Sequence, residues 1–216
     1  VFSRLAKEIT IAAREGADPG ANPRLRSVIE KARAENMPSD NIERAIKKGT
    51  GEDAGQLEEV LFEAYGPGNI ALLIAAITDN KNRTLGEVKQ TLAKNKGKFV
   101  EGGAVRWLFE RKGVITIQPK AEGIPLSPRD EIELIAIEAG AEDVYWHDDV
   151  LGMYLNPSEF EKALQLLQAR DLTAASSLDW IPKERISISE QDMAATEKLF
   201  EALDENDDVQ DIYSNI

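Results

Sequence analysis

The sequence predicts an α+β protein in which an N-terminal helical bundle precedes two domains of mixed strands and helices. Apolar residues recur at intervals of three and four over the first fifty residues, which is the spacing of short amphipathic helices. From Leu57 onward the spacing changes to alternation and to continuous apolar runs, which indicate strands. Helical spacing returns between these strands, so the later part of the chain is expected to combine both kinds of element.

The first fifty residues are expected to contain three helices. The apolar stripe of the first ends near Gly16. The second begins at Asn22-Pro23, where the Asn side chain can cap free amides and Pro suits the first turn. The third has Ser39 or Asp40 as its cap and Gly49 as its stop. Isolated helices of about a dozen residues are marginal in water, so the three are expected to pack together.

A linker is expected over residues 50–56, and the middle domain then begins at residue 57. Its expected elements are two strands, a helix and a pair of strands joined by a tight turn at Arg111-Lys112-Gly113: Val60–Tyr65, Ile70–Ile77, Arg83–Lys94, Ala104–Phe109 and Val114–Gln118. We interpret them as part of a split β-α-β, or ferredoxin-like, arrangement.

The end of the chain supplies the missing helix and strand of that arrangement. Ser189 is expected to cap a helix, and Val209–Tyr213 reads as a last strand. Residues 119–184 read as helix, strand, strand, helix and strand, a second unit of similar kind. We therefore predict two ferredoxin-like α+β domains, the third domain inserted in the second: 1–56 as bundle and linker, 57–118 plus 185–216 as the middle domain, and 119–184 as an acidic inserted domain.

Charge is distributed unevenly along the chain. The chain has 26 basic and 39 acidic side chains and a net charge of −13, which as an average argues against binding to nucleic acid or to an anionic membrane. However, residues 1–112 hold 19 basic and 16 acidic side chains, whereas residues 113–216 hold 7 and 23. Because its first half is basic, the chain remains compatible with binding to nucleic acid.

Several functional classes are excluded by what the sequence lacks. Without Cys there is no disulfide, thiolate zinc site or cysteine nucleophile, which fits a reducing compartment. His147 is the only histidine and has no partner motif, so we interpret it as a surface or strand residue. The longest apolar run, Ile70–Ile77, is less than half of the roughly 20 residues of a membrane helix. Because Val1 lies in a helical pattern, we expect the natural protein to have a further N-terminal segment.

No motif for catalysis, cofactor binding or metal binding is evident. The sequence has no phosphate-binding loop ending in Lys-Ser/Thr, dinucleotide fingerprint, zinc-binding helix or nucleophile elbow. The acidic pairs Asp148-Asp149 and Asp207-Asp208 suit a solubilising role better than a divalent ion, because neighbouring strand residues point to opposite faces. We therefore expect a protein without enzymatic activity, cofactor or metal.

The candidate functional residues are basic and amide side chains of the first half. The segment Thr78–Thr84 joins a strand to a helix N-terminus, where free amides favour an anion, although its Asp and Asn residues can instead cap the helix. A glycine-containing basic loop follows, which can approach phosphates or can equally be a solvated surface. The expected nucleic-acid contacts are Arg44, Lys47, Lys48, Asn80, Lys81, Asn82, Arg83, Lys94, Lys96 and Lys98.

Taken together, these segments resemble the YebC family, which is annotated with transcriptional regulation and is similar to the mitochondrial translational activator of cytochrome c oxidase subunit I. The matching stretches are Asn22–Arg26, Asn36–Ile46, Tyr65–Gly68, Thr78–Thr84, Phe109–Gly113, Glu138–Asp143 and Ile181–Lys183. The resemblance implies a three-domain cytoplasmic protein without known catalytic activity. The sequence departs from the family's pattern in two places. The family's basic leading segment, which contains Gly-His-Ser-Lys-Trp, is absent from it, and its loop over Lys94–Ala104 is less rich in glycine.

The function predicted from these observations is a non-enzymatic, nucleic-acid-binding regulator of gene expression, most simply a transcriptional regulator that binds DNA. An alternative is a translational activator that associates with the ribosome and its RNA. A second alternative is a module whose acidic third domain docks a basic protein, and a third is an enzyme acting on a phosphorylated small molecule. The expected partner is promoter DNA or ribosomal RNA. We expect no association with a membrane, and we favour a monomer.

Overall fold

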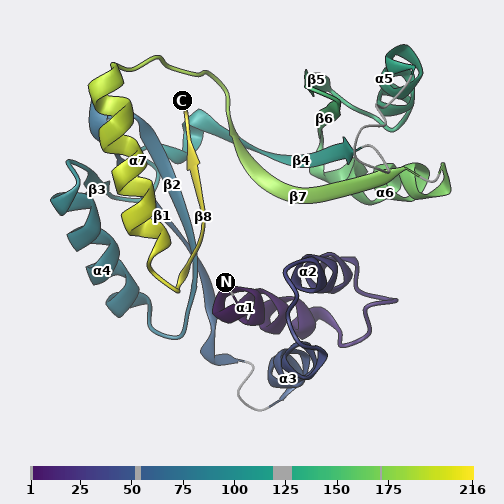
Figure 1. The fold of residues 1–216 in the computed structure, drawn as a ribbon. Helices are drawn as coiled ribbons and strands as arrows, with labels where there is room; N and C mark the ends of the chain where they lie inside the picture. The colour runs from purple at the N-terminus through teal and green to yellow at the C-terminus, as the bar shows by residue number, and fades with distance from the viewer. Residues whose placement is uncertain (1, 52–54, 119–127, 171) are drawn as a thin grey trace. The chain divides into compact units, whose positions relative to one another are not determined.

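The computed structural model describes residues 2–51, 55–118, 128–170 and 172–216. The chain divides into two compact units, Val1–Phe109 with Pro182–Ile216, and Glu110–Ile181. Helices and two four-stranded sheets make up these units, so the predicted α+β class is confirmed (Figure 1). Of the linker expected over 50–56, residues 52–54 lie outside the described residues.

The N-terminal bundle consists of three helices, α1 (Phe2–Ala12), α2 (Pro23–Ala34) and α3 (Ser39–Thr50). Their buried side chains form one core that includes Ile9, Leu25 and Ile42. The predicted cap of α2 is confirmed, because the Asn22 side chain accepts a hydrogen bond from the Leu25 amide at 3.0 Å. The predicted cap of α3 is wrong: Pro38 occupies that position, and no side chain caps this end.

Gly49 lies inside α3 and does not end it as predicted. A Cβ atom at this position would lie 2.3 Å from the Thr10 carbonyl oxygen of α1. It would lie 2.8 Å from the Cβ of Ala13, which begins the short 3-10 helix after α1. The absence of a side chain therefore lets α3 approach the backbone of α1 closely.

Substitution of Gly49→Ala is expected to destabilise the bundle by about 1–3 kcal/mol, because the added methyl group meets rigid backbone that cannot move aside cheaply. Chemical denaturation followed by circular dichroism measures this change. Gly86→Ala in α4 is the matched control, since its Cβ would meet nothing within 4 Å and Ala is the better helix former. Equal stability of the two variants would contradict the close approach.

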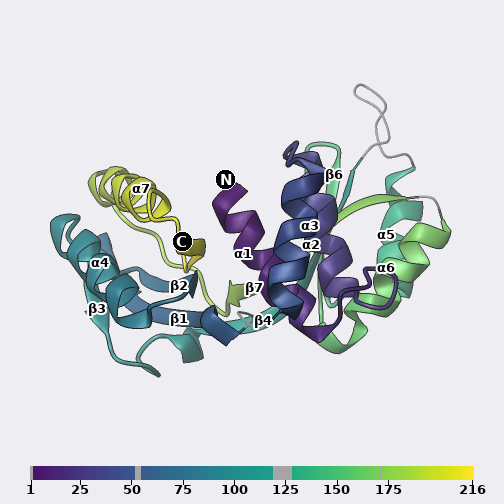
Figure 2. The ribbon, with the colours of Figure 1, turned by 90° about the horizontal axis from the view of Figure 1, so that it is seen from below.

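The first sheet is built from β1 (Glu58–Tyr65), β2 (Ala71–Thr78), β3 (Lys98–Val100) and β8 (Val209–Ser214) in the order β3-β1-β2-β8. Helices α4 (Lys81–Lys94) and α7 (Glu190–Asp204) cover one face of it (Figures 1 and 2). Every other residue of β2 packs beneath these helices, together with Phe62 and Ala64 of β1. As predicted, Ser189 caps α7 by accepting a hydrogen bond from the Asp192 amide at 3.1 Å.

The second sheet forms the core of the other unit, in the order β5-β6-β4-β7. Its elements follow one another as β-α-β-β-α-β: β4 (Phe109–Gln118), α5 (Arg129–Glu138), β5 (Asp143–His147), β6 (Val150–Leu155), α6 (Phe160–Ala169) and β7 (Thr173–Pro182). This order is that of a complete split β-α-β unit. Side chains such as Ile115, Leu151 and Leu167 fill its core.

The structure places the boundaries between the two α+β units differently from the sequence prediction. Val114–Gln118 belongs to the second sheet, because β4 pairs with β6 from Gly113 opposite Leu155 to Ile117 opposite Leu151. The expected turn at 111–113 lies inside this strand, and Arg106–Leu108 is a short 3-10 helix and not part of a strand. The inserted unit therefore spans 110–181 where 119–184 was expected, and β4 is its first strand.

Candidate nucleic-acid interface

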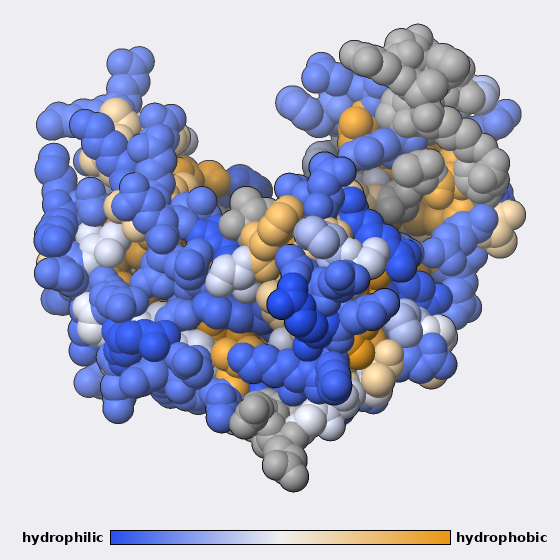
Figure 3. All heavy atoms as spheres, turned by 60° about the horizontal axis from the view of Figure 1, so that its bottom comes forward, coloured by the Kyte–Doolittle hydropathy of each residue, from blue (hydrophilic) through white to orange (hydrophobic). Residues whose placement is uncertain are grey.

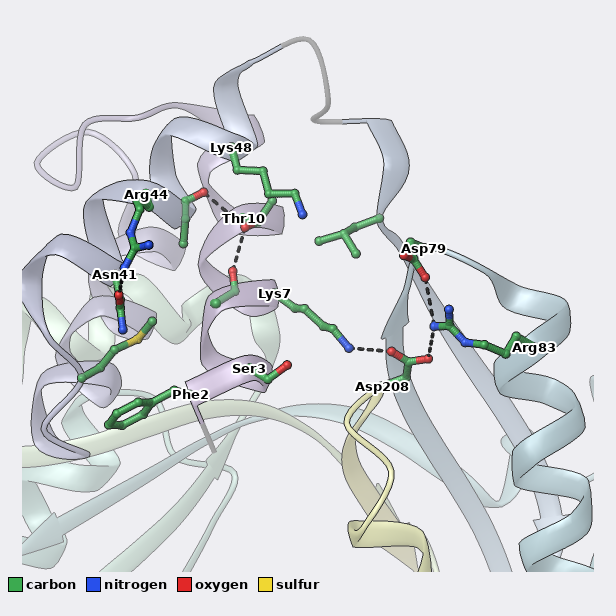
Figure 4. Close-up of a pocket in the computed structure, with 14 residues that line it drawn as sticks. Phe2, Ser3, Lys7, Thr10, Asn41, Arg44, Lys48, Asp79, Arg83 and Asp208 are labelled. Carbon is green, nitrogen blue, oxygen red and sulfur yellow. Dashed lines mark hydrogen bonds and ion pairs between the residues drawn. The ribbon is translucent and has the colours of Figure 1, made fainter.

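A groove in the first unit brings together residues of the bundle and of the first sheet (Figure 4). Its volume is about 510 Å³. Lys7 of α1 and Arg44 and Lys48 of α3 line it from the bundle, and Asp79, Arg83 and Asp208 line it from the sheet. Apolar side chains complete its wall: Phe2, Ala6, Met37, Ala45 and Leu57.

The carboxylate of Asp208 is the centre of the polar contacts in this groove. It accepts hydrogen bonds from Lys7 Nζ at 2.5 Å, Arg83 Nη2 at 2.8 Å and Thr84 Oγ1 at 2.6 Å. Thr78 Oγ1 lies 3.2 Å away. Asp208 is only 6% exposed, so its charge depends on these partners. This residue thus links α1, the start of α4 and the start of β8.

The pKa of Asp208 reflects two opposing effects. Burial alone would raise the pKa, but the hydrogen bonds from Lys7, Thr84 and Arg83 outweigh burial and hold it well below the ordinary range of an aspartate. The residue is therefore ionised at neutral pH. The solubilising role predicted for the pair Asp207-Asp208 is wrong for Asp208, because this carboxylate is buried and paired.

The N-terminus of α4 already has an anionic neighbour within the chain. The Asn80 side chain caps the helix by accepting a hydrogen bond from the Arg83 amide at 3.1 Å. The Arg83 guanidinium is paired with Asp79 at 2.9 Å and with Asp208. Lys81 and Asn82 are exposed beside it. Capping and internal pairing therefore account for Asn80 and Arg83, and Lys81 keeps its charge toward solvent.

Arg44, Lys47 and Lys48 lie on one exposed face of α3, because their spacing of three and four residues is that of a helix. Arg44 donates hydrogen bonds to the Asn41 side chain and the Asp40 carbonyl oxygen, which orient its guanidinium. Both Arg44 and Lys48 line the groove, and Figure 4 shows Lys48 pointing into it while Arg44 lies beside Asn41. Among the described residues, no acidic side chain forms an ion pair with any of these three.

Lys94, Lys96 and Lys98 form a second exposed basic group at the other end of α4. Lys94 is in its last turn, Lys96 has a left-handed backbone with φ of 60°, and Lys98 begins β3. A helix of 14 residues separates this group from Lys81 by about 20 Å. The structure therefore brings the predicted residues together in three places: on α3, at the start of α4, and around its end.

The glycine-containing loop that follows β3 is held by hydrogen bonds to a side chain of β1. The buried Glu63 carboxylate accepts hydrogen bonds from the amides of Gly103, Val105 and Arg106 at 2.6, 2.7 and 2.9 Å. Burial would raise the pKa of Glu63, but these three bonds lower it below the ordinary range. The sequence suggested that this loop could approach a phosphate, but its amides at 103, 105 and 106 surround the carboxylate of Glu63 in β1.

Sequence reasoning missed Lys7, Glu63 and Asp208 as organising residues. The signal for Glu63 is an acidic residue within an apolar strand that precedes a glycine-rich loop with free amides. The reading of His147 as a surface residue is confirmed by a side chain that is 88% exposed. Within the described residues, no group of three or more His, Cys, Asp or Glu side chains is arranged to hold a metal ion.

Figure 3 shows hydrophilic side chains over much of the face that it draws, with hydrophobic side chains between them. In the parts of the chain that the structure describes, none of the helices has the length and apolar character required to cross a bilayer.

Two family profiles together match nearly the whole chain. Residues 1–52 match the TACO1/YebC protein N-terminal domain, and residues 57–216 match the TACO1/YebC second and third domain. A protein of Kosmotoga olearia named "Probable transcriptional regulatory protein" is 46% identical over the whole chain and 84% of its own length. A protein of the same name from Geobacillus thermodenitrificans is 44% identical over the whole chain and 87% of its length.

Among solved structures, the crystal structure of a conserved hypothetical protein from Aquifex aeolicus matches this fold with a TM-score of 0.88. It is 41% identical, and the match covers 99% of this chain and 88% of that one. This match supports the fold described above. The chain therefore belongs to the TACO1/YebC family.

Proposed function

We propose that this protein regulates gene expression by binding nucleic acid without catalysing a reaction. The observation that carries the proposal is a group of exposed basic side chains for which the described residues offer no ion pair. This group includes Arg44, Lys47, Lys48, Lys81, Lys94, Lys96 and Lys98. Other basic residues of the same unit, such as Lys7, Arg24 and Lys31, are paired with acids. The names of the relatives, which describe transcriptional regulation, support the same function.

These basic side chains contact the phosphates of the nucleic acid, with Asn80 and Asn82 shaping the turn beside them. Contacts with phosphates provide affinity and fix the orientation of the protein, but they do not distinguish one base sequence from another. They serve duplex DNA at a promoter or structured RNA of the ribosome equally well. DNA is the leading target because the relatives are named as transcriptional regulators, and action on translation is the alternative.

The affinity for duplex DNA is expected to fall steeply as salt rises, with a log-log slope of about −0.9 for each phosphate neutralised. Replacing Lys94, Lys96 and Lys98 together with Ala should flatten this slope by up to about 2.7. The same change in Arg44, Lys47 and Lys48 should act similarly, because both groups are exposed and the part of the chain that the structure describes pairs neither of them with an acid. Fluorescence anisotropy over a salt series measures these slopes.

The matched control replaces Arg24, Lys31 and Lys162, three basic residues whose charges are paired with acids. It removes the same number of positive charges, so it separates local contacts from the effect of net charge. Affinity that is independent of salt, or equal losses in the control and in both groups, would exclude the proposed interface. A titration with a ribosomal RNA fragment run in parallel compares the two targets.

A second candidate function, docking of a basic protein by the acidic inserted unit, is favoured by α5. Leu134 and Ile137 of this helix are 64% and 60% exposed, and acidic residues flank them in the sequence. Affinity purification of the full chain with nuclease treatment distinguishes this candidate. A basic protein that remains bound after nuclease, and is lost when both apolar residues become Ser, supports docking. Loss of all bound material on nuclease treatment argues against it.

A further inference from the structure

The side chain of Trp107 is exposed on a loop that the structure holds in place. It is 65% exposed, the largest fraction among the large hydrophobic side chains of the described residues. Its indole N–H donates a hydrogen bond to the Ala104 carbonyl oxygen of the same loop at 3.0 Å. The polar edge of the ring is therefore satisfied, while much of the ring surface remains open to solvent.

The loop around Trp107 is fixed on both sides. Before it, Glu63 binds the amides of Gly103, Val105 and Arg106, and the Val105 side chain is fully buried. Gly103 has φ of +91°, a conformation that suits glycine. After it, the Leu108 carbonyl oxygen accepts a hydrogen bond from the Lys183 amide at 2.9 Å, and Phe109 is buried. The ring is thus presented by a preorganised backbone, which lowers the entropic cost of binding.

The basic side chain of Lys98 lies on the same face of the sheet as the carboxylate that holds this loop. Tyr65 pairs with Lys98 and Glu63 pairs with Val100 across β1 and β3, and paired residues point to the same face. Phe62 and Ala64 pack beneath α4 and α7, so Glu63 and Lys98 lie on the opposite face. Between residues 94 and 108 the chain has four basic side chains and one acidic one. An exposed aromatic ring on a loop bound to the face that carries an exposed lysine suits a nucleotide, which offers a base for stacking and a phosphate for charge.

We propose that Trp107 stacks on an unpaired base of bound nucleic acid, while Lys98 contacts a phosphate of the same strand. This inference rests on the proposed function and makes it more specific, because the bases of an intact duplex are stacked on one another and leave no face for a side chain. The protein then prefers single strands, loops or melted ends over uniform duplex. Glu63 acts as a positioning residue for this platform.

Replacement of Trp107→Ala in the full chain tests the proposal with short labelled oligo(dT) and oligo(rU), and with the oligo(dT)·oligo(dA) duplex as the comparison. Affinity for the single strands should fall about 5- to 140-fold, the range for loss of one base–aromatic stack. Affinity for the duplex should change much less. Trp107→Phe should retain most single-strand affinity, since its ring still stacks.

Salt dependence separates the two kinds of contact. Trp107→Ala removes no charge and should leave the salt slope unchanged, whereas Lys98→Ala should flatten it by about 0.7 on single strands. Leu134→Ala is the control for loss of an exposed apolar side chain. Unchanged single-strand affinity of Trp107→Ala, or equal loss on single strand and duplex, would overturn the stacking role while nucleic-acid binding stands. A wild-type protein that binds neither probe would overturn the proposed function as well.

Discussion

Replacing Asp208→Asn is expected to lower the free energy of unfolding by about 2–4 kcal/mol, because hydrogen bonds to a buried charge are lost, Lys7 loses its ionic partner and Arg83 keeps, among the described residues, only Asp79 and the distant Glu87. The carboxylate accepts from Lys7, Arg83 and Thr84. Asn keeps the shape of the side chain, but one of its two acceptor positions becomes an NH₂ group that faces donors. Chemical denaturation at neutral pH measures the loss.

The control for this change is Asp204→Asn. Asp204 also forms an ion pair with α1, at 2.6 Å from Arg4, but its side chain is 69% exposed. An exposed pair contributes about 0–1 kcal/mol, so this variant should be nearly as stable as the wild type. Hydrogen exchange should accelerate in α1 for Asp208→Asn and remain unchanged for Asp204→Asn. Similar stability of the two variants would contradict the central role of Asp208.

The contribution of Asp208 to the free energy of unfolding should decrease as the pH is lowered into the acidic range. Its pKa in the folded protein lies below the ordinary aspartate value of about 3.9. The unfolded chain therefore takes up a proton first as the pH falls, and the stabilisation declines below about pH 4. It is fully present above that value. Denaturation at pH 7 and pH 3 should show the difference between wild type and Asp208→Asn shrinking at the lower pH, and a constant difference would contradict the assignment.

Replacing Glu63→Gln is expected to destabilise the fold by about 2–4 kcal/mol and to loosen the loop that presents Trp107. The carboxylate accepts three amide hydrogen bonds with two oxygens, and Gln offers one oxygen and one NH₂ group. At least one buried amide then faces a donor, which costs about the desolvation penalty of that group. Chemical denaturation measures stability, and hydrogen exchange at residues 103, 105 and 106 reports on the loop.

Glu58→Gln serves as the control for Glu63→Gln, because Glu58 is an exposed residue of the same strand. Its stability should lie within about 0.5 kcal/mol of the wild type. Exchange at the three loop amides should rise only in Glu63→Gln. If exchange at these amides is the same in both variants, the carboxylate does not hold the loop.

Local signals in the sequence predicted most of the elements. The cap at Asn22 and the cap at Ser189 were recognisable because each places a side-chain oxygen before a helical apolar pattern. The run Ile70–Ile77 predicted the central strand β2, whose residues are almost all buried. These features depend on neighbouring residues alone, so a single sequence contains the information.

Features that depend on distant residues could not be predicted in this way. Val114–Gln118 has the same strand pattern whichever sheet it joins, and only its pairing with β6 decides the domain boundary. Gly49 resembled a helix stop because nothing in its neighbourhood shows that α1 passes within contact distance. Asp208 resembled a solvent-facing acid because Lys7, one of its partners, lies some two hundred residues earlier.

The candidate site was predictable in its residue types but not in its arrangement. The exposed lysines and Arg44 were visible as a basic excess in the first half. The pairing of Arg83 with Asp79 and Asp208, which uses its charge within the fold, was not. A basic side chain is available to a phosphate only where the fold places no acid beside it, and that depends on tertiary contacts.

Ultraviolet crosslinking in cells, followed by sequencing of the bound nucleic acid and mass spectrometry of the crosslinked peptides, tests the central claim most directly. We expect crosslinked DNA or RNA, with attachment sites in α3 and between residues 94 and 108, including Trp107. Sequencing then identifies promoter DNA or ribosomal RNA as the target. Absence of crosslinked nucleic acid, or attachment only within the acidic unit at residues 110–181, would contradict the account.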